Sequence, residues 1–575
     1  MAIYRSDQAV VTFGAEAALG GHPERCTQAD AGSGTGAVAT ATEAGTFAIS
    51  VDNGSGAGIA AGFAAGAFMT LGSNVTNMEL RKIVGRSGSA SGVAGNTTLY
   101  LDAPTGFYHP DNAVAQVVTA FSADTDTDKF ITYLPGVYDT VTVPDMTPTI
   151  EPRYFLGAGS KRNFTAAYKG TQSYNGSVPS FILLNAAALR FPFGTMTTSP
   201  SASSGTITAV GASKKGDTFI SFDGTDRADL IAGDYFEISG QTGALSDGSY
   251  KEVCRIVSKT GTSTVTAQLS TPLRFDHVDD SDINEITHSS SIAYTHTITE
   301  SNVLDSIAMN VHMRDSGETT ANDFDRRFFG GKVGAATLSA EEGGLLVMGW
   351  DSIPFMGGVH NQKLDPNSSI TGGDVPFYGL TRSIASDNVG AHTGASSVLE
   401  YPTTDPYYFS QGTVSLFGTE FARVRNFTLN VNNNVEPRYY VERRGDSRLR
   451  GPSDIVEMRR EYTMDATIAL PDTVNSATSD TTSLFKQLMM EGDYGAGMKG
   501  FNIQLVFTRG TNDTITIDIP DDGASTGAAV GLDEQGAYLT EAPHPIDGSN
   551  PYEVSASMMF RNLKITVVDN VPLYP

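Results

Sequence analysis

IEPRYFLGAGSKRNF, residues 150–164, and VEPRYYVERRGDSRL, residues 435–449, carry the letters EPRY at the same place. Each stretch belongs to a longer series of similar order. A strand-like segment leads through a loop to a second strand, then to a helical segment and further strands. Because this order recurs, and not only four letters, we predict that one domain is duplicated within the chain.

Alternating apolar residues dominate both halves. NFTLNVNN (426–433), FNIQLVF (501–507) and LKITVVD (563–569) place an apolar residue at every second position, which is the pattern of half-buried strands. Helical spacing is rare, and we expect helices only at FILLNAAALRF (181–191) and SLFKQLMMEG (483–492). The predicted fold class is therefore mainly β, with one helix in each half.

A second, different repeat lies within the first half. ELRKIV (79–84) resembles EVCRIV (252–257), and PTGFYH (104–109) resembles PLRFDH (272–277), with Pro, Phe and His at matching places. The spacing between the two motifs differs by a few residues, which a hairpin loop absorbs. We expect each copy to form a small β-barrel-like module inserted at a loop of the first half.

The chain has 575 residues, too many for one ordinary domain. The two repeats predict four units. These are a discontinuous first larger domain made of residues 1–27, 141–202 and 289–400, an inserted module at 28–140, a second inserted module at 203–288, and a second larger domain at 401–575.

The net charge of −26 limits the possible partners. An acidic chain repels nucleic acid and anionic membranes, so binding of DNA over the whole surface is excluded. No stretch reaches the roughly 20 apolar residues that cross a bilayer. The N-terminal MAIYRSDQAVVTFG also lacks the apolar core of a signal peptide. We expect a soluble chain made in the cytoplasm, without a membrane partner.

The residues predict no catalytic, cofactor or metal site. GAGSK (157–161) lacks the spacing of a phosphate-binding loop. The acidic runs at 124–128 and 277–282 lack the Gly and distal Glu of an EF-hand, so we interpret them as solvated loops. His109 and His277 recur at matching places of the two modules. We interpret them as repeated packing or turn residues, with a metal ligand as the alternative.

Cys26 and Cys254 are the only cysteines. Two thiols make no disulfide framework and form no CxxC motif. A single bridge between them and two separate buried thiols both remain open, and the second is the simpler interpretation.

Basic residues gather in residues 436–462, interleaved with acidic ones. A nucleic-acid patch would be basic and aromatic with few acids. Alternating signs instead suit a complementary protein surface, where charge pairs set the register. A solvated strand pair with weak ion pairs is the alternative. We predict a subunit interface, with the candidate residues Glu151 and Arg153 in the first copy and Glu436, Arg438, Arg443, Arg444, Arg448 and Arg450 in the second.

The chain resembles the major tail (tail-tube) proteins of long-tailed double-stranded DNA viruses. The resemblance is carried by YRSDQAVVTFGAEAALGG (4–21), FTAAYKGTQSYNGSVPSFILLNAAALRFPFG (164–194), FGGKVGAATLSAEEGGLLVMGWDSI (329–353) and RVRNFTLNVNNNVEPRYYVERRG (423–445). It depends on the order of elements rather than on a strict motif. The two inserted modules depart from the family pattern.

The resemblance implies two tube-type β-sandwich domains, each with a flanking helix and a long hairpin loop. In that family six such domains join their inner sheets into a ring, and rings stack into the hollow tube through which viral DNA passes during ejection. Two domains per chain imply a homotrimeric ring with pseudo-sixfold symmetry, favoured over a hexamer. The implied location is the virion tail, assembled in the host cytoplasm. The implied partners are further copies of the chain, the tape measure, tail terminator and distal tail proteins, and DNA in transit without specific binding.

Two other classes stay open at this stage. A surface-exposed adhesin-type or other virion β protein that binds a host surface also fits Gly-rich acidic β modules. A β-rich glycan hydrolase would find enough carboxylates here, but a single Trp, Trp350, is little provision for stacking sugars. The residues favour a structural protein without catalysis. Surplus acids suit a DNA conduit if they line its bore, and the bracing or host-binding role of the inserted modules is left open.

Overall fold

The protein is mainly β, as predicted, and one α-helix occurs in the part of the chain that is described. The computed structural model describes residues 4–21, 31–53, 59, 62–72, 78–88, 95–101, 103–118, 136–145, 149–154, 164, 166–184, 186–223, 230–239, 250–287, 291–315, 324–360, 405–416, 423–440, 451–469, 500–510, 513–521, 532–533, 536–541, 543 and 553–573.

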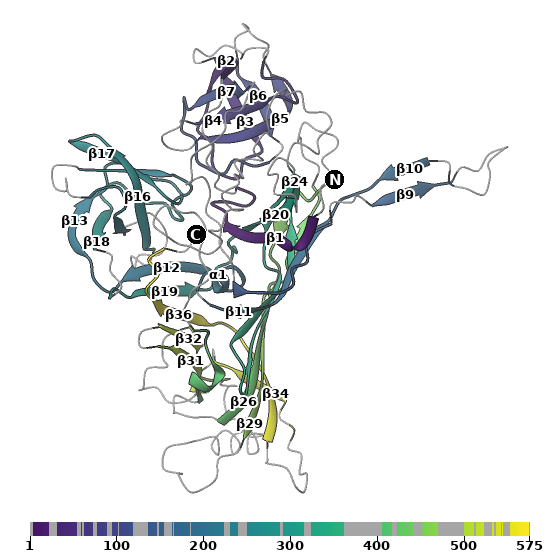
Figure 1. Ribbon diagram of the computed structural model, residues 1–575, viewed down its shortest axis with the longest axis vertical. Coiled ribbons are helices and arrows are strands. Elements are labelled where there is room, and N and C mark those ends of the chain that lie inside the picture. The colour runs from purple at the N-terminus through teal and green to yellow at the C-terminus, as the bar shows by residue number, and fades with distance from the viewer. Residues whose placement is uncertain are drawn as a thin grey trace.

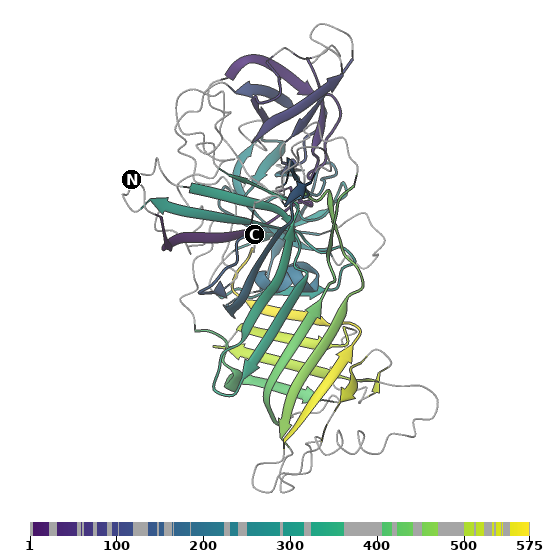
Figure 2. The ribbon, with the colours of Figure 1, turned by 90° about the vertical axis from the view of Figure 1, so that its right-hand side faces the viewer.

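The largest sheet has eight antiparallel strands, four from each half of the chain (Figure 2). Its strands alternate buried apolar and open polar side chains, as the sequence pattern predicts. In sheet order the strands are β34 (Tyr538–Glu541), β35 (Glu553–Phe560), β29 (Glu461–Ala469), β26 (Arg423–Asn432), β22 (Ala335–Glu341), β23 (Val347–Phe355), β11 (Tyr174–Leu183) and β8 (Gly136–Val137).

A six-stranded sheet packs against the buried face of the eight-stranded sheet, and its strands cross behind the larger sheet in Figure 2. It too takes strands from both halves, and a 3-10 helix (Phe409–Gln411) precedes its last strand. In sheet order the strands are β12 (Thr195–Pro200), β19 (Tyr294–Thr299), β36 (Lys564–Asp569), β32 (Asp513–Ile519), β31 (Ile503–Arg509) and β25 (Gly412–Leu416).

One apolar core fills the space between these sheets and contains residues of both halves. At its centre the Trp350 ring makes edge-to-face contacts with Phe13, Phe181 and Phe191, at centroid distances of 5.2, 5.4 and 5.9 Å. Phe427 of the larger sheet stacks on Phe507 of the smaller one at 5.6 Å. The prediction of two separate sandwich domains is therefore not confirmed, because the halves share their sheets and their core.

The helix α1 (Ala187–Phe193) is wholly buried in this core. It starts later than the predicted helix at 181–191, because residues 181–183 continue strand β11, where Phe181 and Ile182 pair with β23 and Leu183 pairs with β8. The other predicted helix, at 483–492, lies outside the described residues.

A four-stranded sheet carries the N-terminal strand beside the core. In order it contains β1 (Tyr4–Ala15), β20 (Ile307–Asp315), β21 (Phe324–Gly331) and β24 (Gly357–His360).

Each inserted region has a β module with its own apolar core. The first is a closed barrel of β2 (Ala31–Val38), β3 (Ala48–Asp52), β6 (Thr97–Leu101), β5 (Glu79–Gly88), β4 (Phe68–Leu71) and β7 (Val114–Val118). The second is a six-stranded sheet of β13 (Ser204–Thr208), β18 (Asp282–Ile286), β15 (Tyr235–Ile238), β16 (Glu252–Thr260), β17 (Thr264–Leu269) and β14 (Phe219–Asp223).

Three short strand pairs complete the fold. In Figure 1, β9 (Ile150–Arg153) and β10 (Ala166–Lys169) extend away from the body. The other pairs are β27 (Glu436–Arg438) with β28 (Asp454–Val456), and β30 (Gly500–Phe501) with β33 (Leu532–Asp533). Both EPRY stretches thus begin a hairpin.

Candidate assembly interface

The eight-stranded sheet repeats one arrangement of four strands. Its first-half part runs β8-β11-β23-β22, and its second-half part runs β26-β29-β35-β34. In both parts the first two strands flank an EPRY hairpin in the chain, and the last two form a hairpin with each other. The second part is therefore a side-by-side copy of the first, turned the same way round.

Matching residue pairs support this equivalence. Leu338 of β22 lies opposite Met348, and Leu539 of β34 lies opposite Met558. One strand further across the sheet, Phe181 faces Met348 as Met464 faces Met558, and all four side chains are buried.

The two parts join where β22 pairs with β26 along its whole length. The outer strands of the sheet are the counterparts of these two: β8 corresponds to β26, and β34 corresponds to β22. Among the described strands each outer strand pairs on one side only. The sheet therefore has two free-standing edges, β8 and β34. The strands equivalent to them, β26 and β22, already pair with each other inside the chain.

The open face of the eight-stranded sheet is polar. Its side chains are mostly hydroxyls and amides joined across strands. Thr337 Oγ1 donates to Asp351 at 2.9 Å and also lies 3.2 Å from Asn430 Oδ1, and Ser557 donates to Asp465 at 2.6 Å. A hollow of about 660 Å³ lies on this face across β22, β26, β29 and β35.

Acidic side chains outnumber basic ones on this face. Arg425 bridges Glu553 at 3.0 Å and Glu342 at 3.4 Å, so its charge is compensated locally. Charged residues of the sheet strands on the open face are the acids Glu341, Asp351, Glu461, Asp465, Glu541 and Glu553 and the bases Arg423 and Arg425.

The two EPRY hairpins have different surroundings. The β27–β28 hairpin packs on the first half: Ile455 is buried beside Phe329 and Met356, and Tyr439 donates to the Gln172 carbonyl at 3.0 Å. Lys332 anchors it further, with its Nζ 2.7 Å from Glu457.

The β9–β10 hairpin, which projects from the body in Figure 1, instead has large apolar side chains that are exposed. Ile150, Tyr154, Phe164 and Tyr168 are 61%, 68%, 57% and 60% exposed. A cluster of this kind on an extended hairpin is typical of a contact with another molecule.

The candidate interface residues divide into described and undescribed ones. Arg153 pairs with Glu151 at 2.8 Å and Arg438 with Glu436 at 2.7 Å, each within one exposed or half-exposed strand. These contacts link neighbours on the same strand face and are weak in solvent. Arg443, Arg444, Arg448 and Arg450 lie outside the described residues.

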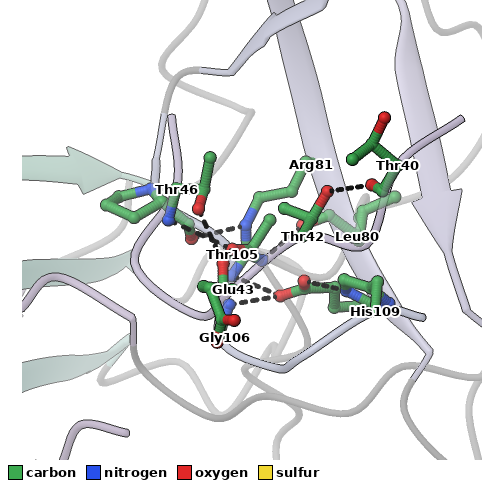
Figure 3. A network of polar contacts seen from close by, with 11 residues as sticks. Thr40, Thr42, Glu43, Thr46, Leu80, Arg81, Thr105, Gly106 and His109 are labelled. Carbon is green, nitrogen blue, oxygen red and sulfur yellow. Dashed lines mark hydrogen bonds and ion pairs between the residues drawn. The ribbon is translucent and has the colours of Figure 1, made fainter. Parts of the chain in front are cut away.

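The recurring histidines are fully or almost fully buried and meet the recurring glutamates. His109 Nε2 lies 2.5 Å from Glu79 (Figure 3), and His277 Nε2 lies 2.7 Å from Glu252. Arg81 also reaches Glu79, at 2.6 Å, and lowers the pKa of that carboxyl against the opposing effect of burial. Sequence matching placed each Glu and His correctly in its repeat but gave no sign that they touch.

A hydroxyl, an imidazole and a carboxylate meet between β12, β19 and β36. Thr198 Oγ1 lies 2.9 Å from His296 Nδ1, and His296 Nε2 lies 3.1 Å from Asp569. All three side chains are buried, and His296 Nε2 also lies 3.1 Å from the Val571 carbonyl. Because all three side chains are buried between strands, we interpret the group as a structural network.

Cys254 is a free thiol buried in the second module, and burial raises its pKa. Cys26 lies outside the described residues. In the part of the chain that is described, no group of three or more His, Cys, Asp or Glu side chains is arranged to hold a metal ion. No helix in that part is long and apolar enough to cross a membrane.

Compared with known proteins, the sequence matches no family model and no curated protein.

Proposed function

We propose that the chain is a structural subunit of a hollow viral tail tube, and that three copies close one ring. Each copy would contribute two tube-type units to a pseudo-sixfold wall, and stacked rings would form the conduit for DNA. The observation that carries this proposal is the repeated strand order of the eight-stranded sheet, which leaves two complementary edges.

Ring closure follows from that repeat. Inside the chain, β22 of one unit pairs with β26 of the next. If β34 pairs in the same way with β8 of a neighbouring copy, each unit is related to the next by the same rotation, within a chain and between chains. A head-to-tail contact of this kind closes into a ring and leaves no sheet edge exposed.

The open face of the sheet would line the bore. A wall of hydroxyls, amides and surplus carboxylates attracts no phosphate backbone, so DNA would pass without being held. The apolar core lies behind this face, and the second inserted module lies on the opposite side of the molecule from it (Figure 1). In this arrangement that module would decorate the outside of the tube.

The β9–β10 hairpin would dock on a neighbouring copy. Its counterpart, β27–β28, already packs on the preceding unit within the chain and buries Ile455 there. By the same relation, the exposed Ile150 and Tyr168 would be covered by the second half of the preceding subunit, whose β34 pairs with β8. The tape measure, terminator and distal tail proteins are the partners that such a tube needs at its interior and ends.

The internal joint predicts the register of the seam. Leu338 lies opposite Leu429 in the β22–β26 joint. The equivalent of Leu338 is Leu539, and the equivalent of Leu429 is Tyr138, which follows β8 directly. Leu539 of one copy should therefore face Tyr138 of the next, and Thr540 should face Val137.

Oxidative cross-linking tests this register. Cysteines introduced as Val137→Cys and Thr540→Cys in one chain should link copies into a closed covalent trimer on a denaturing gel, because directly paired Cβ atoms lie about 5 Å apart. The control combines Thr540→Cys with Val210→Cys, an exposed valine of the second module. A closed trimer from the control pair, or only unlinked chains from the seam pair, would contradict the proposed ring.

A further inference from the structure

A pocket of about 400 Å³ lies where three parts of the molecule meet. The segment Ala15–Leu19 forms one wall, and Arg190 of α1 with residues 301 and 303–306 forms another. The third wall comes from the second inserted module, through Lys215, Tyr250 and residues 271–276. The size falls within the usual range of small-ligand sites.

Positive charge gathers in this pocket although the chain is strongly acidic. Four basic side chains line it, against three carboxyls, and one of the four, Lys332, is paired with Glu457 outside the pocket. One of those carboxyls, Glu16, has its pKa raised to about 7 by burial and so carries only part of a charge near neutral pH. The basic residues are Arg190, Lys215, Arg274 and Lys332, and the acidic ones are Glu16, Asp276 and Asp305.

Arg190 presents an unsatisfied donor in this setting. Its side chain is 3% exposed, and its Nε donates to Asp305 at 2.5 Å. Its NH1 group is buried and has no hydrogen-bond partner. A buried guanidinium nitrogen without an acceptor is costly, and because NH1 has almost no accessible surface, the Arg190 side chain would turn toward an oxyanion in the pocket to satisfy it.

Asp305 compensates only part of the nearby positive charge. Arg190, Lys215 and Arg274 all lower its pKa, against the opposing effect of burial. Burial and the charge of Arg190 lower the pKa of Arg274 to about 9, against the opposing attraction of Glu252 and Asp305, so the two guanidinium groups repel each other. A second anion beside Asp305 would relieve this repulsion.

An aromatic pair completes the pocket. The rings of Tyr250 and Phe275 lie 4.8 Å apart, and both line the wall that the module contributes. Beside the guanidinium groups, this surface suits a ligand that joins a small apolar body to an oxyanion.

We propose that this pocket binds a small phosphate monoester, with Arg190 and Arg274 as donors to the phosphate and Tyr250 and Phe275 against its apolar group. The ligand would touch the module, the core helix and the N-terminal segment together. Its binding would therefore fasten the second module to the body of the molecule. This proposal stands independently of the tube.

Isothermal titration of the purified full chain tests the site, with inorganic phosphate and phenyl phosphate as probes and chloride at matched ionic strength as the reference. We expect saturable binding of both, with phenyl phosphate tighter by about tenfold because its ring leaves water. Absence of saturable binding would overturn the site. Equal affinity for the two probes would overturn the role assigned to Tyr250 and Phe275.

Two variants locate the binding. Lys215→Gln should weaken phosphate binding about 3- to 10-fold. The matched control is Lys214→Gln, an adjacent exposed lysine that does not line the pocket and should bind normally. Arg190→Lys keeps a cation beside Asp305 and removes the second nitrogen, so it should weaken binding by at least about tenfold. Equal effects of Lys214→Gln and Lys215→Gln, or normal binding by Arg190→Lys, would contradict the assignment.

Discussion

In both inserted modules a buried carboxylate holds a strand and a distant turn together by hydrogen bonds. Glu252 of β16 accepts hydrogen bonds from the backbone N–H groups of Arg274 and Phe275 and from His277. Glu79 of β5 holds the Gly106 N–H and His109 in the same way. Each carboxylate thereby ties a strand to a turn more than twenty residues away, and its loss would leave several donors buried without partners.

Glu252→Ala should loosen the second module. We expect the module to lose about 2–4 kcal/mol of stability, because the variant removes one acceptor and leaves three buried donors without a partner. Hydrogen exchange of the β16 and β17 amides measures the loss locally, without assuming that the whole chain unfolds in one step. Thr264→Ala, an exposed change in the same module, should alter protection by less than about 0.5 kcal/mol. Similar losses in both variants would contradict the fastening role.

Asp217 makes stability depend on pH. Its Oδ2 accepts the Lys214 N–H at 2.7 Å, and its Oδ1 is buried without a partner. Burial, helped by the negative Glu43 and Asp276, raises the pKa of Asp217 from 3.8 to about 6. The folded state thus holds the proton more tightly than the unfolded state. Its contribution is complete below about pH 4 and is lost as pH rises through about 6.

Asp217→Asn should remove this loss. The amide carries no charge, so the variant should be more stable than the natural chain above about pH 7, by up to about 3 kcal/mol. Below about pH 4 the advantage should disappear. Thermal unfolding at several pH values measures the difference, with Asp111→Asn on the first module as the exposed control. A constant difference at all pH values would count against titration of Asp217.

Sequence matching could place Glu79 and His109 at equivalent positions of two modules, because the repeated letters align. It could not predict their contact. Residues 30 positions apart meet only after the strands close around the module, and that closure depends on pairings that no local pattern encodes. The pocket at Arg190 escaped prediction for the same reason, since its walls come from three separated segments.

At the scale of elements, the two EPRY hairpins have the same start and different surroundings. The β27–β28 hairpin buries Ile455 to 1% exposure, whereas the β9–β10 hairpin leaves Ile150 at 61%. Because the β27–β28 hairpin is buried against the body, its contacts contribute to the free energy of unfolding of the single chain. The other contributes to the single chain only through its own strand pairing.

Ile455→Ala should destabilise the single chain by about 2–4 kcal/mol, because it opens a cavity between the hairpin and Phe329. Ile150→Ala should change the free energy of unfolding by less than about 0.5 kcal/mol. Urea unfolding under conditions that keep the chain monomeric measures both. In assembled rings we expect Ile150→Ala to have the larger effect of the two on the contact between subunits, and so to weaken the rings. A large loss for monomeric Ile150→Ala would show that the hairpin already packs on its own chain.

Alternation predicted the strands of the eight-stranded sheet well, because each has one buried and one open face. The helix was harder to predict. Residues 181–191 are apolar except for Asn185 and Arg190, so their pattern fits a buried strand as well as a buried helix. Leu183 pairs across to β8 and ends the strand, and the helix begins only at Ala187.

At the scale of the whole molecule, the structure shows where part of the acidic surplus lies. Part of it lies on the open face of the large sheet, where Asp351 and Asp465 are exposed. The net charge can be counted from the sequence, but its distribution cannot. Which acids share one face of the sheet depends on the register in which β22 of the first half pairs with β26 of the second. The sharing of one core by both halves was unpredictable for the same reason.

Charge reversal on the open face should create DNA binding. The double variant Asp351→Lys with Asp465→Lys removes the acidic surplus of the face, leaving four acids against four bases, so the chain should retain more short duplex DNA at low salt than the natural chain and release it as salt rises. The natural chain should not bind. Asp111→Lys with Asp282→Lys makes the same change of net charge on the modules and serves as the control. A mobility-shift assay reads the result, and DNA retention by the natural chain would contradict a non-adhesive wall.

Electron cryomicroscopy of assemblies grown from the purified chain tests the tube most directly. The account predicts hollow tubes with three chains in each ring, in which β34 of one copy continues into β8 of the next with Leu539 opposite Tyr138. Particles that stay monomeric, or rings in which β8 and β34 both remain unpaired, would contradict it.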